Sequence, residues 1–170
     1  MNMELNNIDL PPLLIVDLYR KTFVEIDEVK TNHQDSSDEN DEWKFLGGNL
    51  KNISIIVNYK DATHLYDKQL EFLVTMLSAC KLSLEDVSII NINNYPDKKY
   101  KELTGYFKSK IIFLFDVDPV SFGLPVRFPH FQVQQFSMST FLFLPTLKEI
   151  QNDEVLKSKL WVCLRRIFEI

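Results

Sequence analysis

Ile53-Ser54-Ile55-Ile56-Val57 leads directly into the polar turn Asn58-Tyr59-Lys60-Asp61, and this stretch decides the fold. An amphipathic segment follows over residues 67–80, and Ser88-Ile89-Ile90-Asn91-Ile92-Asn93 forms a second apolar run. A strand, a helix and a strand in this order predict a βαβ unit, whose first strand ends in the loop where α/β proteins place their chemistry. That loop contains no glycine and no paired nucleophile and base, so the sequence predicts an enzyme-like frame without an obvious enzyme site.

The rest of the chain continues the alternation of helices and strands. Apolar residues recur at helical spacing over residues 100–107. Ile111–Phe115 and Thr140–Leu144 are unbroken apolar runs, which are typical of strands buried on both faces. A closing helix is expected to begin with Asn152 or Asp153 as its cap. Together these elements predict the α/β class, and more specifically a three-layer α/β/α sandwich around a mostly parallel central sheet.

Charge is unevenly distributed along the chain, whose net charge is −5. Residues 1–45 hold eleven acidic and four basic side chains, whereas residues 46–170 hold thirteen and fifteen. We therefore predict an N-terminal helix and short strand over 1–30, an acidic linker or loop over 31–45, and an α/β domain over 46–170. The domain lacks the strong basic field of proteins that grip phosphate backbones, so any nucleic-acid contact is expected to be weak and local.

Composition also limits the compartment and the cofactors. No apolar run is long enough to span a membrane and no signal peptide is evident at the N-terminus, so we expect a cytoplasmic protein. Cys80 and Cys163 are expected to be reduced, buried thiols. The three histidines have no metal-ligand partner at helical or hairpin spacing, so neither a metal nor another cofactor is expected.

Two groups of polar side chains follow predicted strands. After the first strand, Asp61 could activate a water and Asn58 could contact a ligand, or both could satisfy backbone groups of the turn. Asp116 and Asp118 follow the strand over 111–115, where carboxylates can be metal ligands or general bases. For this pair we favour the alternative that Asp118 caps a turn, because no third carboxylate or histidine supports a metal site.

Phenylalanine is concentrated in the second half of the chain. Most of these rings are expected to fill the core, since several fall on predicted strands. Phe122 and Phe128 instead flank Gly123-Leu124-Pro125 in a predicted loop. We expect them to be exposed as an apolar patch, and such patches usually bind another protein.

Two stretches carry a resemblance to a known family. Leu82-Ser83-Leu84-Glu85-Asp86-Val87-Ser88-Ile89-Ile90-Asn91 looks like a helix exit and second strand, and Leu144-Pro145-Thr146 looks like a His-Pro-Ser/Ala motif followed by its helix. On these stretches the last two-thirds of the chain resembles the uracil-DNA glycosylase superfamily. The resemblance implies a pocket at this edge of the sheet, here reduced to a vestige formed by Asn58, Tyr59, Asp61 and Leu144.

The departures from that family bear on activity. Active members carry a Gly-Glu-x-Pro-Gly-like turn where this chain has Asn58-Tyr59-Lys60-Asp61-Ala62, without glycine. Leu144 stands where the family has a histidine, and a leucine can neither hydrogen-bond a base nor stabilise a departing anion. The resemblance therefore implies that base excision has been lost and that no residue is catalytic.

A catalytically inactive branch of this fold, the psi-subunit family of bacterial DNA polymerase III, is similar in the same places. The similarity lies in the strand and polar turn, in Leu-Ser-Leu-Glu-Asp-Val, and in Leu-Lys-Glu-Ile followed by Leu-Trp-Val-Cys-Leu. It implies a non-enzymatic clamp-loader accessory in DNA replication that binds the loader through its N-terminal segment and a chi-like subunit through its domain. The candidate interface residues are Leu13, Leu14, Phe122 and Phe128.

Two alternatives remain open on the sequence. One is a DNA-repair enzyme of the glycosylase type acting on uracil or damaged bases, in which Asp61 or Asn58 positions water and a loop aromatic stacks on a flipped base. The other is a single-stranded nucleic-acid-binding module without catalysis, whose binding would depend steeply on salt.

Overall fold

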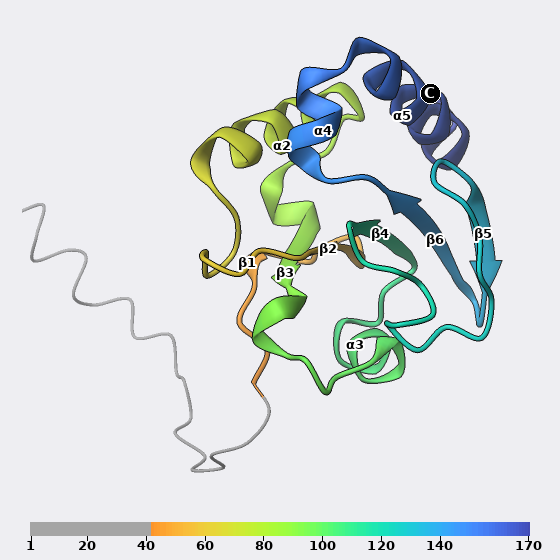
Figure 1. Ribbon diagram of the computed structural model, residues 1–170. Coiled ribbons are helices and arrows are strands. Elements are labelled where there is room, and N and C mark those ends of the chain that lie inside the picture. The colour runs from red at the N-terminus through yellow and green to blue at the C-terminus, as the bar shows by residue number, and fades with distance from the viewer. Residues whose placement is uncertain (1–41) are drawn as a thin grey trace, which may run out of the picture. The chain divides into compact units, whose positions relative to one another are not determined.

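Six strands within residues 42–170, the part of the chain that this computed structural model describes, form one sheet in the order β1-β3-β2-β4-β6-β5 (Figure 1). The predicted helix and strand over 1–30, and with them Leu13 and Leu14, lie outside the described residues. The strands are β1 (Leu46–Gly47), β2 (Ile53–Val57), β3 (Val87–Asn91), β4 (Ile111–Phe115), β5 (Val133–Phe136) and β6 (Ser139–Leu144). The four helices of this part are α2 (Asp67–Ala79), α3 (Tyr100–Phe107), α4 (Leu147–Asn152) and α5 (Glu154–Phe168), with 3₁₀ turns η1 (Leu84–Asp86) and η2 (Ile92–Asn94).

The pairing confirms an α/β protein with a mostly parallel sheet. β2 pairs in parallel with both β3 and β4, and β4 pairs in parallel with β6. The two edge strands are antiparallel: β1 pairs with β3 and β5 with β6. The carboxyl ends of the four parallel strands therefore meet at one edge of the sheet.

The central strands form because their side chains are apolar or small on both faces. Every residue of β2 and β3 is buried, including Ser54 and Ser88. Burying a hydroxyl is tolerated only when it is hydrogen-bonded. Ser54 Oγ lies 3.1 Å from Ser88 Oγ and 2.6 Å from Ser109 Oγ, so the serines satisfy one another inside the sheet.

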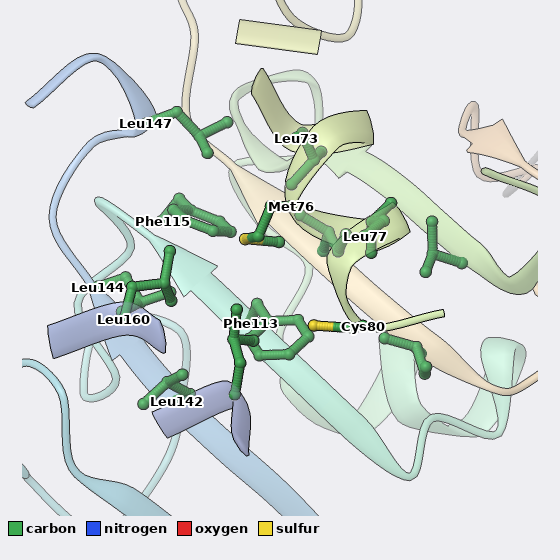
Figure 2. Close-up of a cluster of buried hydrophobic side chains, with 14 of the residues drawn as sticks. Leu73, Met76, Leu77, Cys80, Phe113, Phe115, Leu142, Leu144, Leu147 and Leu160 are labelled. Atoms are coloured by element: carbon green, nitrogen blue, oxygen red, sulfur yellow. The ribbon is translucent and has the colours of Figure 1, made fainter. Parts of the chain in front are cut away.

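One face of the sheet carries a core made with three helices. Figure 2 shows Leu73, Met76 and Leu77 of α2 meeting Phe113 and Phe115 of β4. Leucines of β6, α4 and α5 complete the same cluster: Leu142, Leu144, Leu147 and Leu160. Full burial of a side chain of this size stabilises the fold by about 1.5–3 kcal/mol.

The opposite face is covered by α3 and by the segment before β1. The predicted helix face is confirmed, since Tyr100, Leu103 and Phe107 are buried against β2 and β4 residues such as Ile56 and Leu114. Trp43 joins this second cluster, with its ring centroid 4.6 Å from that of Tyr95 and 6.0 Å from that of Phe107. Helices thus contact both faces of the sheet.

Trp43 lies near the start of the compact unit that contains the sheet. The linker was expected to continue to residue 45, but Trp43 is only 3% exposed, and the compact unit that contains the sheet begins at Glu42. Composition does not indicate this, because Trp43 is the only tryptophan among polar and acidic neighbours in the sequence 31–44. The short strand β1 follows, where Gly47 has a φ of +110° and a Cβ would lie 2.2 Å from the carbonyl oxygen of Val87.

The ends of the last two helices are set by short-range polar contacts. Asp153 caps α5 as predicted, its Oδ1 accepting from the backbone N–H groups of Val155 at 2.8 Å and Leu156 at 3.2 Å. Helix α4 was not predicted. It is held by a capping box in which Thr146 Oγ1 accepts from the backbone N–H of Glu149 while the Glu149 carboxylate accepts from the backbone N–H of Thr146.

Candidate functional site

The candidate site lies where the four parallel strands end. Val57, Asn91, Phe115 and Leu144 are the last residues of β2, β3, β4 and β6. Open α/β sheets bind ligands in the crevice outside these ends, because the loops that follow converge there. The polar residues after β2 and β4 are therefore brought to one edge.

Asn91 holds the loop after β2 in place. Its fully buried side chain donates from Nδ2 to the carbonyl oxygens of Tyr59 and Ala62, both at 2.7 Å. Its Oδ1 accepts from the backbone N–H groups of Tyr59 at 3.0 Å and Asn93 at 3.2 Å. One amide thus makes four hydrogen bonds, which fixes the backbone of the glycine-free turn. The importance of Asn91 was not predicted, because an asparagine inside an apolar run carries no positional signal of its own.

Asn58 and Asp116 lie side by side at the mouth of a groove. Asn58 Nδ2 donates to the carbonyl oxygen of Asp116 at 3.5 Å, and the Asp116 N–H donates to the carbonyl oxygen of Leu144 at 3.0 Å. Both side chains line a hollow of about 380 Å³ that also has Asn93, Lys98 and Lys99 in its wall. Asp116 has a φ of 56°, a left-handed conformation that Asp and Asn tolerate better than other non-glycine residues.

Asp116 is the one groove residue with a raised carboxyl pKa. Partial burial raises the pKa most, the Glu149 carboxylate raises it further, and His130 lowers it. Asp116 directly follows β4, His130 precedes β5, and Glu149 lies in α4, so the three residues are far apart in the sequence. His130 packs against Phe143 with ring centroids 4.1 Å apart and the rings tilted by 43°, which holds the imidazole at this edge. The grouping was missed because it exists only after the sheet is assembled.

Tyr59 is a partly buried residue with a raised phenol pKa. Burial, the neighbouring Tyr66 and the charge of Asp116 raise the pKa of its phenol to about 12. Its ring packs on that of Tyr66, with centroids 5.2 Å apart, against the α2 side of the core. At neutral pH the phenol is therefore protonated.

The four residues predicted as a vestigial pocket do not converge. Asn58 lines the groove described above, but Asp61 lines a different hollow of about 650 Å³, with Lys44, Thr63 and Tyr95 among its neighbours. Leu144 is fully buried in the core under α4. The prediction of one shared pocket is wrong for Leu144, which is buried, whereas the hollows lined by Asn58 and by Asp61 share Tyr95 in their walls.

Asp118 has the capping role that we favoured. Its Oδ2 accepts from the backbone N–H of Ser121 at 2.9 Å and from the Ser121 hydroxyl at 3.1 Å. The backbone N–H of Ser121 is the main cause that lowers the pKa of this carboxyl. Lys99 Nζ donates to the Ser121 carbonyl oxygen at 2.9 Å, which ties the same turn to the start of α3.

The expected apolar patch at Phe122 and Phe128 is wrong. Phe122 is 3% exposed and Phe128 is 4% exposed, and both belong to the core on the α3 face. The turn capped by Asp118 explains the burial of Phe122. It folds Phe122 back toward α3, where the Phe122 carbonyl oxygen accepts from the backbone N–H of Tyr100 at 3.0 Å. Phe128 packs on Phe143, with centroids 6.5 Å apart. Neither ring is available for a partner in this conformation.

Comparisons with known proteins add no assignment. No protein-family model and no curated protein matches the chain.

Within residues 42–170, no group of three or more His, Cys, Asp or Glu side chains is placed to hold a metal ion. None of the helices in this range has the length and apolar character needed to cross a membrane.

Proposed function

We propose that this chain is a non-enzymatic protein-interaction subunit in DNA replication, similar to the clamp-loader psi subunit. In this proposal the described residues form a three-layer α/β/α sandwich of the uracil-DNA glycosylase type. Helices on both faces of a mostly parallel sheet are compatible with that architecture. The chain would bind the clamp loader through its N-terminal segment and a chi-like subunit through its domain.

One observation carries the non-enzymatic part of the proposal. Leu144, which stands where the glycosylase family has its histidine, is fully buried in the core and lines neither of the two hollows that Asn58 and Asp61 line. A general base must lie within hydrogen-bond reach of its target, together with the groups that bind the substrate. Asn91 fixes the backbone of the loop that contains Asp61, since it binds that loop at both Tyr59 and Ala62.

A direct binding measurement tests the interaction part. Purified chain is titrated by calorimetry with clamp-loader and chi-like subunits from the same organism. Binding to both is expected, and replacing both Leu13 and Leu14 by Glu should abolish loader binding while leaving chi-like binding unchanged. No binding to either subunit would contradict the proposal.

The competing functions have their own readouts. A glycosylase would release uracil from single- or double-stranded DNA, and Asp61→Ala would remove that activity. A single-stranded DNA-binding module would bind with an affinity that falls steeply with salt. The groove contains Lys98 and Lys99 beside Asp116 and Asp118, so its charge is mixed and gives little support for phosphate binding.

A further inference from the structure

Helix α5 presents an apolar face to solvent. Its inner side is buried through Leu160, Cys163 and Leu164. On the outer side Val155 is 62% exposed, Val162 is 65% exposed and Trp161 is 39% exposed. Val155 and Val162 are seven residues apart, so they lie two turns apart on one side of the helix. α5 is an outer helix of the described domain (Figure 1).

The outer face of α5 also has an ordered charge pattern. Glu154 opens the helix, and Arg165 lies near its end. The Glu154 side chain is 87% exposed although its carboxylate pairs with Lys157 at 2.6 Å. Arg165 uses its Nε–H to bind the carbonyl oxygen of Ile170 at 3.1 Å, and a guanidinium has further N–H donors in a fixed fork. The small side chain of Ser158 lies between these two ends.

We propose that this face, formed by Glu154, Val155, Ser158, Trp161, Val162 and Arg165, docks against the same face of a second copy with the two α5 helices antiparallel. A two-fold axis near residue 159 brings equivalent sides of the two helices together. Val155 then meets Val162 of the second copy on one side. On the other side Trp161 crosses the small Ser158 of the second copy, and Glu154 faces its Arg165.

The charges of Glu154 and Arg165 favour an antiparallel arrangement of the two helices and a second copy as the partner. In an antiparallel pair each Glu154 carboxylate faces a guanidinium, whereas a parallel pair would place the two Glu154 residues together and the two Arg165 residues together. Like charges in register are destabilising, and bidentate Arg–carboxylate pairs are among the stronger hydrogen-bonded contacts. The face is therefore complementary to itself, as an isologous two-fold contact requires.

This dimer goes beyond the proposed function and does not depend on it. The face consists of one helix surface, which is smaller than the interfaces of permanent dimers. A weak, concentration-dependent equilibrium is expected, with a dissociation constant between about 1 μM and about 1 mM. Loss of clamp-loader binding would leave this inference intact, and a monomeric chain would leave the proposed function intact.

Sedimentation equilibrium of the full chain over that concentration range tests the dimer. Wild-type protein should fit a monomer–dimer equilibrium. Val162→Lys should raise the dissociation constant about tenfold or more, because it places a charge in the apolar centre. Val74→Lys is the matched control, since Val74 is a 38% exposed valine on α2, and it should leave the constant unchanged.

Charge reversal tests the antiparallel pairing itself. Glu154→Arg alone and Arg165→Glu alone should each weaken association, and the double variant should return the dissociation constant to within about threefold of wild type. A protein that remains monomeric at all concentrations would overturn the proposal. So would equal effects of the two lysine variants, a double variant no better than the singles, or an α5 face that binds a different protein in preference to itself.

Discussion

Asn91 and Tyr59 form a reciprocal pair, in which the Asn91 amide donates to the Tyr59 carbonyl at 2.7 Å and its oxygen accepts from the Tyr59 N–H at 3.0 Å. A buried side chain thus replaces, for one residue, the backbone pairing that a neighbouring strand would provide. The pair continues the contact between β2 and β3 beyond the end of the strands. Together with the bond to the Ala62 carbonyl, it fixes the backbone on both sides of Asp61.

Asn91→Asp should therefore destabilise the domain strongly. The carboxylate would accept from the same N–H groups, but it would face the carbonyl oxygens of Tyr59 and Ala62 without donors. We expect a loss of about 2–4 kcal/mol in the free energy of unfolding, measured by urea denaturation, because buried acceptors are left unsatisfied. Asn93→Asp, on an exposed side chain of the next turn, should change stability by less than about 0.5 kcal/mol. Equal losses in both variants would show that Asn91 does not hold the loop.

Trp43 should be required for the stability of the domain. Its ring packs on Tyr95 and Phe107, and Lys98 Nζ lies 4.6 Å from its centroid. Trp43→Ala should lower the free energy of unfolding by about 3–5 kcal/mol, as for other buried tryptophans. Leu50→Ala is the control, since Leu50 is largely exposed. A chain beginning at residue 46 should melt at a lower temperature than one beginning at 42, and identical melting would place the boundary where the composition predicts it.

Leu144→His should not create a glycosylase. The substitution restores the residue type of the active family, but the side chain lies in the core with Leu142 and Leu147. We expect no uracil release and a loss of about 2–4 kcal/mol in stability, because an imidazole would be buried without a partner. Release of uracil by this variant, measured on single-stranded DNA, would contradict the conclusion that the four residues no longer form one pocket.

Asp116 should make the protein slightly less stable at neutral pH than it would be with a neutral side chain there. Because its pKa is raised in the folded state, the folded protein favours the protonated carboxyl, and the stability from that preference is lost as pH rises through the raised pKa. Asp116→Asn should therefore be more stable than wild type at pH 7, and the gap should close below the ordinary aspartate pKa of about 3.9. The exposed position limits the gain to about 0.5 kcal/mol. Thermal melts at pH 3 and pH 7, with Asp61→Asn as control, measure it, and a less stable variant at pH 7 would contradict the sign.

The Tyr59 phenol should ionise at a higher pH than an ordinary tyrosine. Its phenol has a pKa of about 12 in the fold, whereas an unfolded tyrosine ionises near its ordinary value of 10.0. The stability from keeping it neutral is fully present below pH 10 and is lost as pH rises from there toward 12. Tyr59→Phe should lose less stability over that range than wild type. Ultraviolet titration of tyrosinate should show a late-titrating phenol in wild type that is lost in the variant, and an unchanged titration curve would contradict the assignment.

Much of the fold was predictable because local sequence patterns, such as apolar runs and helix caps, determine it. The runs Ile53–Val57, Ile111–Phe115 and Thr140–Leu144 are all strands, and the Asp153 cap follows from residue type and position. What could not be predicted depends on tertiary contacts. Trp43 becomes core only through Tyr95 and Phe107, and strand β1 has just two residues.

The site was harder to predict than the fold. Asn58 and Asp116 were identified from their places after strands, and they do meet in one groove. The burial of Phe122 depends on how the Asp118 turn folds, which a loop sequence does not reveal. His130 and Glu149 act on Asp116 from separate elements, so no spacing in the chain relates them.

The most direct test of the proposed function is affinity purification of the tagged chain from its native host at moderate salt, with mass spectrometry of what co-elutes. We expect clamp-loader or polymerase subunits to co-elute in stoichiometric amount. They should be lost when Leu13 and Leu14 are both replaced by Glu and retained in Val162→Lys. A chain that elutes free of these subunits would contradict the proposed function as a replication subunit.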